Sequence, residues 1–327
     1  MAVATPALGP VDLSRVTVRL PGLAEPVEDV VLRAGHTARD ARIFKALGLR
    51  TTRSLAEGER MDELLLDAAC AALDGAPAGL VLYAHTLMMR RIELYGGLRD
   101  TLRDKVAGPD GRVFGISHVN CVGALRSIEL ARRYLARRES GPDDRVLLLT
   151  GEQGSVNPYA RVFPGRSISG DCVAAVVLQR PGDGARPRYR YLGGAASRDA
   201  RFHRNIRMTE AEIATNTEVI RAQTLDVVRR AADAAGVGLD RIDWVMPHLS
   251  NRMVWTHFCA HSGYPFERIC LDLLPERGHN FGADELMALE HADGAGRLRP
   301  GDVCALVASG RGAYFQSVIV EVLEDAS

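Results

Sequence analysis

The sequence predicts an α/β protein with a mostly parallel sheet, covered by helices on both faces and built from two similar halves. Three observations support this prediction. Short apolar runs typical of buried strands alternate with amphipathic helical segments, and the same order of segments occurs twice along the chain. In addition, 327 residues exceed what one hydrophobic core usually supports, so two packed halves are expected.

The first half has a helix, a break and a strand, followed by a second helix. The stretch "MDELLLDAACAALDGAPAGLVLYAHT" predicts an amphipathic helix, a Gly/Pro break and a buried strand that ends at His85. A long helix beginning at Cys121 follows, then the strand "DDRVLLLTGEQ", which runs into Gly151. The segment "CVAAVVLQR" predicts the β-structure that closes this half.

The second half repeats this plan. "EVIRAQTLDVVRRAADAAGVGLDRIDWVMPHLS" predicts a helix, a Gly-containing turn and a strand that ends at His248. "GHNFGADELMALEHA" then corresponds to the Cys121 helix, and "GDVCALVASGRG" and "AYFQSVIVEV" correspond to the two closing strands. The stretch "QRPGDGARPRYR", rich in Pro, Gly and Arg, marks the boundary, so we expect halves at residues 1–181 and 182–327.

The position of Cys121 on its predicted helix has chemical meaning. Apolar residues recur at helical spacing from Cys121 through Leu125 and Ile128, Asn120 is a suitable N-cap, and arginines crowd the last turns. The positive end of a helix dipole favours a thiolate, which is one way to make a cysteine nucleophilic. The alternative interpretation is a small buried hydrophobic side chain.

The repeat indicates what the thiol could meet. Ligands gather beyond the carboxyl ends of strands in such sheets. Aligning Thr150–Gly151 with Ser309–Gly310 pairs Cys121 with Asn280, so the thiol would face "GHNFGAD" in the other half. The thiol in one half could in this way contact a general base in the other half. Alternatively, the repeat could be only two structural motifs duplicated by descent. Both interpretations stay open.

Composition excludes several classes. Lys+Arg and Asp+Glu are equal at 41 each, which gives no bias toward nucleic acid. The chain has no apolar run of about 20 residues and no signal-peptide layout, so we expect no membrane association and a cytoplasmic protein. Six cysteines form no CxxC pair, and His257 and His261 lack an intervening carboxylate. We therefore expect neither metal nor cofactor.

Four motifs, in order over about residues 45–325, carry a family resemblance: "CVGALRSIELA", "SGDCVAAVVL", "MPHLSN" and "GRLRPGDVCALVASGRGAYFQSVIVEV". They resemble the nucleophile helix, Gly-Asp strand, P-H-x-x-N turn and C-terminal hairpin of the ketoacyl-acyl-carrier-protein synthase III family. The resemblance implies a thiolase-like fold with duplicated mixed-sheet halves in αβαβα layers. It also implies that Cys121 accepts an acyl group from a CoA or carrier-protein thioester.

The same resemblance assigns further site residues. His248 of the P-H-x-x-N turn is implied to be catalytic, and Asn251 of that turn is a possible supporting residue. The oxyanion hole is implied to consist of main-chain groups of Cys121 and of the "SGRG" turn, which contains Gly310, Arg311 and Gly312.

One motif departs from the family pattern. Aligned without a gap to the family's G-N-T-S segment, "GHNFGADELMAL" places His279 at the asparagine and Asp284 at a small residue. The pattern GHxxxxD resembles ketosynthase III-like acyltransferases of secondary metabolism, which pass the acyl group to oxygen or nitrogen. This implies Cys121 as nucleophile, His279 as general base and Asp284 as its orienting carboxylate, because a His–Asp pair can accept the acceptor's proton.

Two other functions stay open. The first is decarboxylative condensation with a malonyl thioester, using Cys121, His248 and, if the loop shifts by one residue, Asn280 as a supporting donor. The second, from a different class, is a catalytically silent partner in a ketosynthase heterodimer. Such partners usually lose the cysteine, which this chain keeps.

The resemblance also implies partners. It predicts a homodimer with a sheet continuous across the twofold axis, for which "AAVVL" and "SVIVEV" are expected to supply apolar strands. The Trp and Arg that clamp the CoA adenine in the family are not matched around "ARIFKALG", which favours a carrier-protein donor. Arginines in "MMRRIELYGGLRD" and "RFHRNIR" could meet an acidic carrier protein, or be ordinary solvated charge; the acceptor is expected to be a small molecule.

Overall fold

The computed structural model describes residues 8–87, 97–137, 141, 144–156, 161–182, 186–204 and 207–324. The strands are β1 (Asp12–Ser14), β2 (Thr17–Arg19), β3 (Leu23–Pro26), β4 (Thr51–Ser54), β5 (Ala78–Ala84), β6 (Ala107–Ile116), β7 (Val146–Gln153), β8 (Val162–Phe163), β9 (Ser167–Ile168), β10 (Asp171–Gln179), β11 (Pro187–Arg198), β12 (Trp244–Pro247), β13 (Val303–Gly310) and β14 (Tyr314–Val322). The helices are α1 (Val27–Arg33), α2 (Ala38–Ala46), α3 (Met61–Leu73), α4 (Leu98–Lys105), α5 (Gly123–Leu135), α7 (Glu210–Ala234), α8 (Arg252–Ser262), α9 (Leu274–Arg277) and α10 (Asp284–Gly294). Two short 3-10 turns, η1 (Asn120–Val122) and η7 (Phe281–Ala283), precede α5 and α10.

The main sheet is mixed and its two flanks follow the same plan. The strand order is β12-β13-β14-β11-β1-β10-β7-β5-β6, with β2 also paired to β10. On one flank β5 is parallel to β6 and β7, while β10 is antiparallel to β7. On the other flank β12 and β13 are parallel and β14 is antiparallel to β13. The duplicated mixed sheet predicted from the resemblance is therefore confirmed. The mostly parallel sheet predicted from the alternation of strands and helices is wrong, because the strands in the middle of the sheet pair antiparallel.

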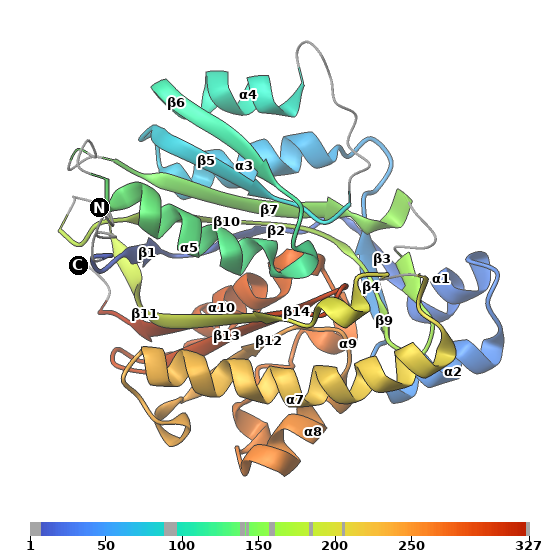
Figure 1. Cartoon of the computed structure of the whole chain (residues 1–327). Coiled ribbons are helices and arrows are strands. Elements are labelled where there is room, and N and C mark those ends of the chain that lie inside the picture. The colour runs from blue at the N-terminus through green and yellow to red at the C-terminus, as the bar shows by residue number, and fades with distance from the viewer. Residues whose placement is uncertain are drawn as a thin grey trace.

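The two flanks lie over one another and enclose a central helical layer. Figure 1 shows α5 and α10 between the flanks, α3 and α4 on one outer side, and α7 and α8 on the other. Neighbouring strand residues point into different cores: on β7, Leu148 packs in the central core and Leu149 in the core with α3. On β13, Leu306 packs in the central core and Val307 in the core with α7 and α8. This is the αβαβα layering of the thiolase-like fold.

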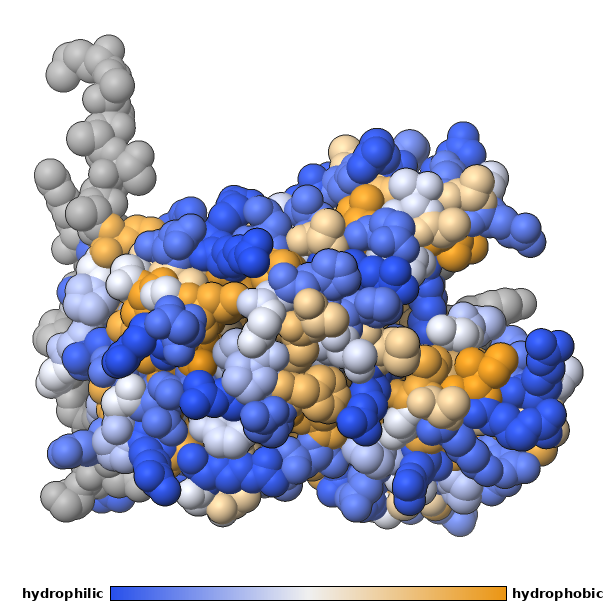
Figure 2. All heavy atoms as spheres, turned by 90° about the horizontal axis from the view of Figure 1, so that it is seen from below, coloured by the Kyte–Doolittle hydropathy of each residue, from blue (hydrophilic) through white to orange (hydrophobic). Residues whose placement is uncertain are grey.

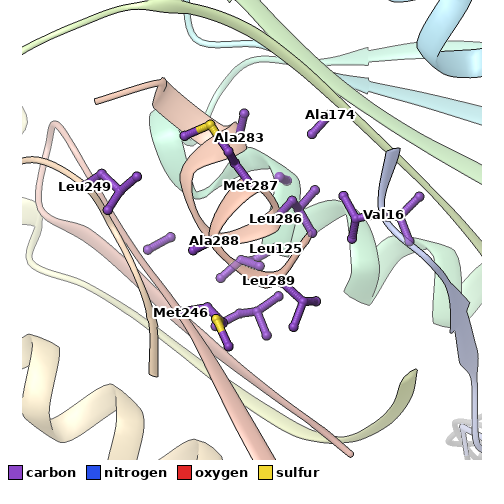
Figure 3. Close-up of a cluster of buried hydrophobic side chains, with 14 of the residues drawn as sticks. Val16, Leu125, Ala174, Met246, Leu249, Ala283, Leu286, Met287, Ala288 and Leu289 are labelled. Atoms are coloured by element: carbon purple, nitrogen blue, oxygen red, sulfur yellow. The ribbon is translucent and has the colours of Figure 1, made fainter. Parts of the chain in front are cut away.

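Helix α10 is buried on all sides because it lies in the central layer. Four consecutive residues, 286–289, are each at most 1% exposed. A helix that is apolar all round belongs in an interior. Figure 3 shows side chains from several elements around it, among them Val16, Leu125, Ala174, Met246 and Leu249. Any polar side chain at the start of α10 is therefore in the protein interior.

The start of α5 differs from the sequence prediction. The α-helix begins at Gly123, and Cys121 lies in η1, one turn earlier. Asn120 does not cap the helix: it has a left-handed backbone with φ 54, and its Nδ2 donates to the carbonyl of Arg311 at 2.9 Å. The Asn120 side chain therefore does not cap α5 but forms a hydrogen bond between the two halves. The basic last turn is confirmed, with Arg132 and Arg133 there.

The internal alignment that paired Cys121 with Asn280 is wrong by two residues. Cys121 is the middle residue of η1, and its counterpart in η7 is Gly282; each lies two residues before its helix. The error arises because the two halves differ in length between the helix start and the aligned strand residue. Thr150 lies 27 residues after the start of α5 at Gly123, whereas Ser309 lies 25 residues after the start of α10 at Asp284.

The strands named for a dimer interface do not lie at an edge. "AAVVL" lies within β10, which pairs with β7 on one side and β1 and β2 on the other, and "SVIVEV" lies within β14, between β13 and β11. The edges of the main sheet are β6 and β12. The strand assignment is therefore wrong, while the homodimer and the domain boundary at residues 181 and 182 stay predictions.

The outer helical layer presents a mixed surface. Seen from below in Figure 2, the face that carries α7 and α8 is mostly hydrophilic, with apolar patches between the polar ones. In the part of the chain that the structure describes, no helix combines the length and apolarity needed to span a bilayer. The cytoplasmic location stays a prediction. Of the proposed carrier-protein contacts, residues 88–96 and 205–206 lie outside the described residues.

Candidate active site

The two 3-10 turns bring the thiol of one half against a loop of the other. A Cβ at Gly282 would lie 3.3 Å from the Cys121 carbonyl oxygen and 3.3 Å from Thr150 Oγ1, so the close approach of η1 and η7 favours glycine there. Gly278, with φ 62, is a second such position, because a Cβ would lie 2.6 Å from the Ile168 carbonyl oxygen. The backbone of "GHNFGAD" is thus close-packed beside Cys121.

The main chain of His279 is held by the first half. Its N–H donates to the carbonyl of Ile168 at 2.9 Å, and its carbonyl accepts from the N–H of Gly170 at 2.8 Å. Gly170 belongs to the "SGDC" motif, so this motif positions the histidine. The motif supplies no side chain to these two bonds, and a residue-by-residue search for reactive groups would pass over it.

Cys121, His279 and Asp284 form a chain of contacts. The Sγ of Cys121 lies 3.6 Å from Nε2 of His279, and Nδ1 of the same ring lies 2.7 Å from Oδ2 of Asp284. Their exposed fractions are 6%, 4% and 0%. Each ring nitrogen therefore has one partner, which is the arrangement of a nucleophile, a base and an orienting carboxylate.

The carboxylate of Asp284, the first residue of α10, also accepts hydrogen bonds from two main-chain N–H groups. Its Oδ2 also accepts from the N–H of Leu249 at 2.7 Å, and its Oδ1 accepts from the N–H of Asn280 at 2.6 Å. The first turn of a helix favours a negative charge. These bonds explain how a wholly buried carboxylate is accommodated, and they join the turn after β12 to the loop before η7.

The two buried histidines of the site differ in charge. Burial lowers the pKa of His279, but the charge of Asp284 and the hydrogen bond to it, together with Cys121, raise it to about 10. For His248, burial and the charge of His279 lower the pKa to about 3, although Asp284 opposes them. The rings lie 4.3 Å apart at an interplanar angle of 69°. At neutral pH His279 carries a proton and His248 is neutral.

His248 follows β12 directly, as predicted. Its carbonyl accepts from Nε1 of Trp255 at 3.0 Å, and its Nδ1 lies 3.3 Å from Oδ2 of Asp284. Among the described residues, the imidazole nitrogen in contact with Sγ of Cys121 belongs to His279. His248 therefore lies beside the thiol–imidazole–carboxylate chain and contacts its carboxylate.

The two candidate asparagines are engaged with nearby backbone groups. Nδ2 of Asn280 donates to the carbonyls of Arg277 and Gly278 at 3.2 and 3.1 Å. Asn251 caps α8, because its Oδ1 accepts from two main-chain N–H groups at 3.0 and 3.3 Å, and its Nδ2 donates to the carbonyl of Arg166 at 2.9 Å. In the structure neither amide donates to the thiol.

The turn predicted to form the oxyanion hole lies against the main chain of Cys121. A Cβ at Gly310 would lie 3.3 Å from the Cys121 nitrogen and 3.0 Å from the Val119 carbonyl oxygen. Arg311 is joined to η1 by the Asn120 hydrogen bond, and Gly312 has a left-handed backbone with φ 83. The structure brings this turn and the thiol together; the role of its N–H groups stays a prediction.

A cavity lies close to the thiol. Cys121 and Phe281 form a small buried cluster, and Leu87 packs against this cluster. Leu87 also lines a cavity of about 770 Å³, whose walls include Tyr83 and Phe114. A pocket of this size can take a small molecule or an acyl chain. Leu87 thus lies between this cavity and the cluster that contains the nucleophile.

Three buried residues of this site could also offer ligand atoms to a metal ion. Within the described residues, His248, His279 and Asp284 offer ligand atoms within 4.8 Å of one another. However, Oδ2 of Asp284 already accepts from Nδ1 of His279 and from a main-chain N–H. The donor set is therefore used by an internal hydrogen-bond chain, and we assign no metal to it.

Sequence reasoning missed Glu285. Its side chain is wholly buried beside Asp284, and its Oε1 lies 3.6 Å from Nδ1 of His248. The signal was present in "ADELMALEHA", where two consecutive acids directly precede four apolar residues, 286–289. A helix without a polar face leaves such acids no route to solvent.

Comparison with known proteins agrees with this fold. Residues 232–322 match the family model of the 3-oxoacyl-[acyl-carrier-protein] synthase III C-terminal region. A β-ketoacyl-[acyl-carrier-protein] synthase III of Ruegeria sp. (strain TM1040) is 23% identical over 318 residues, which cover 90% of this chain and 94% of the relative.

Solved structures agree as well. ChlB3, described as an acyltransferase, has a TM-score of 0.81 at 22% identity over 97% of this chain and 99% of its own. The FabH synthase III of Pseudomonas aeruginosa PAO1 has a TM-score of 0.77 at 19% identity, with the same coverage of 97% and 99%. The chain is therefore similar in sequence to ketoacyl-acyl-carrier-protein synthase III proteins and has the thiolase-like fold of these solved structures.

Proposed function

We propose that the protein is an acyltransferase that moves an acyl group from a thioester, through acyl-Cys121, to an oxygen or nitrogen acceptor of a small molecule. The observation that carries this proposal is the position of His279, whose two ring nitrogens contact the sulfur of Cys121 and the carboxylate of Asp284 at 3.6 and 2.7 Å. This set suits transfer to a nucleophile that must lose a proton.

In the loading step the sulfur of Cys121 attacks the thioester carbonyl as a thiolate, with the proton on His279. The carbon–sulfur bond of the donor breaks, and Nε2 of His279 gives its proton to the leaving sulfur. Main-chain N–H groups of Cys121 and of the turn at residues 310–312 stabilise the developing oxyanion. The products are acyl-Cys121, neutral His279 and the free donor thiol.

In the transfer step neutral His279 accepts a proton from the acceptor hydroxyl or amine as that atom attacks the acyl carbon. The bond from the acyl carbon to Sγ breaks and returns the thiolate, and the proton again lies on Nε2 of His279. Asp284 stabilises the imidazolium and keeps Nδ1–H directed toward itself, so the other nitrogen faces the reacting atoms.

Condensation is the second candidate, and one observation favours it: His248 stays neutral at working pH and could donate to an enolate. Against it, the amide donors of Asn280 are engaged with loop carbonyls, and His279 is charged. The silent-subunit alternative has little support, because the chain keeps both the cysteine and a base in contact with it.

For the donor we propose a carrier-protein thioester, with a CoA thioester as the alternative. The cavity of about 770 Å³ beyond Leu87 is available for the acyl group. ChlB3, a protein of the same fold, is described as an acyltransferase, so this architecture is compatible with the chemistry. No cofactor is needed in the proposed steps.

We also propose a homodimer, because β6 is a sheet edge and Phe114 on it is 52% exposed. Sedimentation at micromolar concentration should give a species of twice 35.5 kDa. A monomer at that concentration would contradict this part of the proposal.

The function is tested by following the fate of the acyl group. The protein is loaded with an acyl thioester, acylation at Cys121 is located by peptide mass spectrometry, and the acyl-enzyme is offered an alcohol, an amine and a malonyl thioester together. We expect an ester or amide and no CO₂. Release of CO₂ with formation of a β-ketoacyl product would establish condensation, and failure to load would favour the silent subunit.

A further inference from the structure

A buried acid beside the site has no role in the steps above. Glu285 is the second residue of α10 and is 0% exposed. Neither of its carboxyl oxygens has a hydrogen-bond partner among the described residues, and the same is true of Nδ1 of His248. Oε1 of Glu285 and Nδ1 of His248 lie 3.6 Å apart. Two groups without partners thus face one another in the interior.

The surroundings keep Glu285 neutral. It is faced by Asp284 from its own helix, by Cys121 from η1, by His279 from the loop before η7, and by His248 after β12. Burial and the charge of Asp284 raise the pKa of Glu285 well above its ordinary value, and the opposing effects of its own main-chain N–H and of His279 are smaller. A neutral carboxyl group has one O–H to donate.

The alternative partner for Nδ1 of His248 is already occupied. Oδ2 of Asp284 lies 3.3 Å away, but it accepts from Nδ1 of His279 and from the N–H of Leu249, both at 2.7 Å. These two donors use both lone pairs of that oxygen. Nδ1 of His248 is therefore better placed to accept a hydrogen bond than to donate one. Glu285 can supply it, because the terminal torsion of a glutamate side chain is broad and a small rotation shortens the contact.

We propose that Glu285 is a positioning residue: its neutral carboxyl group donates to Nδ1 of His248 and so holds that imidazole as the Nε2–H tautomer. The role of His248 in acyl transfer rests on the proposed function, but the contact itself does not. The contact leaves His248 neutral with one N–H to offer, while the adjacent His279 holds the mobile proton. One carboxylate and one neutral acid thus set two histidines in different states.

The burial of Glu285 should lower the stability of the fold, which a function of this residue would explain. A carboxyl group buried without partners destabilises a fold, and a methionine of similar length would pack in the same space at lower cost. Glu285→Met should therefore keep or raise the melting temperature while it removes the donor. Glu285→Gln keeps a donor, because the amide N–H can replace the O–H.

The test measures the tautomer of His248 in the resting protein. Histidine labelled with ¹⁵N reports by NMR which ring nitrogen carries the proton, and loss of one signal in His248→Gln assigns it. We expect Nε2–H in the wild type and in Glu285→Gln, and a shift toward Nδ1–H in Glu285→Met. Infrared spectra should show a neutral carboxylic acid band that both Glu285 variants lose and that the control Glu290→Gln, on the same helix, keeps.

Activity gives a second readout. We expect kcat for acyl transfer to fall roughly fivefold to tenfold in Glu285→Met, the worth of one hydrogen bond, and to be largely restored in Glu285→Gln. An Nδ1–H signal in the wild type, or equal tautomers in the Gln and Met variants, would overturn the proposal. These spectra need no substrate, so a failed acyltransferase assay would leave them valid, and a wrong tautomer would leave the proposed function standing.

Discussion

The starts of α5 and α10 have the same backbone plan but different chemistry. Each is preceded by a three-residue 3-10 turn that begins with a left-handed residue, Asn120 at φ 54 and Phe281 at φ 53. The first turn places Cys121 in its middle and leads into a helix without acids in its first turn. The second places Gly282 there and leads into Asp284 and Glu285.

The difference shows how a duplicated fold can divide the side chains of one site between its halves. The shared geometry brings two helix starts together, and the glycine in one turn makes room for the cysteine turn of the other. The carboxylate of Asp284 then holds the imidazole that meets the sulfur. Neither half contains a complete set, so the site depends on their contact.

Removing Cys121, the reactive side chain of the first half, should have the largest effect on activity. Cys121→Ala should abolish acyl loading, because it removes the sulfur that lies 3.6 Å from Nε2 of His279. The measurement is intact-protein mass after mixing with an acyl thioester. Cys70→Ala, at an exposed thiol, is the control and should load normally. Loading of Cys121→Ala at another residue would contradict the assignment.

His279 and His248 should make the free energy of unfolding depend on pH in different pH ranges. The pKa of His279 is about 10 in the folded protein against an ordinary value of 6.5, so its stabilisation is complete below pH 6.5 and is lost as pH rises toward 10. The pKa of His248 is about 3, so its contribution to the free energy of unfolding falls as pH drops from 6.5 toward 3.

Urea unfolding across this pH range checks both signs. His279→Gln should flatten the alkaline decline, which we expect to be on the order of a few kcal/mol, whereas His248→Gln should reduce the acidic decline. An alkaline decline equal in the wild type and in His279→Gln would show that His279 is not the protonated partner of Asp284.

The close packing of η7 against η1 is tested by a variant for which we expect a smaller effect. Gly282→Ala adds a methyl group 3.3 Å from the Cys121 carbonyl oxygen and should destabilise the fold by about 1–3 kcal/mol through overpacking. Gly294→Ala, at the other end of α10, has nothing within 4 Å and should be neutral or stabilising by up to about 1 kcal/mol. Equal stability of the two variants in urea would show that the turns are not closely packed.

Local patterns predicted the strands and the repeat well. The strands ending at His85 and His248 and the two glycine-ended strands lie where apolar runs placed them. The family resemblance grouped Cys121, His279 and Asp284, which lie in contact in the structure, although their catalytic roles stay predictions.

Features that depend on distant contacts were not predictable. Asn120 has the residue type of a helix cap, yet its amide bonds a carbonyl 191 residues away. The two-residue error in the internal alignment came from helices and connections that differ in length between the halves, and hydrophobic periodicity does not report such differences. The partnerless burial of Glu285 follows only once α10 is known to lie between two sheet flanks.

In the proposed mechanism His279 of the second half, held by Asp284, accepts the proton of the acceptor that removes the acyl group from Cys121 of the first half. The most direct measurement times loading and transfer separately in Asp284→Asn and Asn280→Ala, with Glu290→Gln as the matched control. We predict that Asp284→Asn slows transfer by about 10⁴-fold, as loss of a triad carboxylate can, and that Asn280→Ala slows it only a few fold. A mild Asp284→Asn beside an inactive Asn280→Ala would contradict the account and establish the condensing machinery instead.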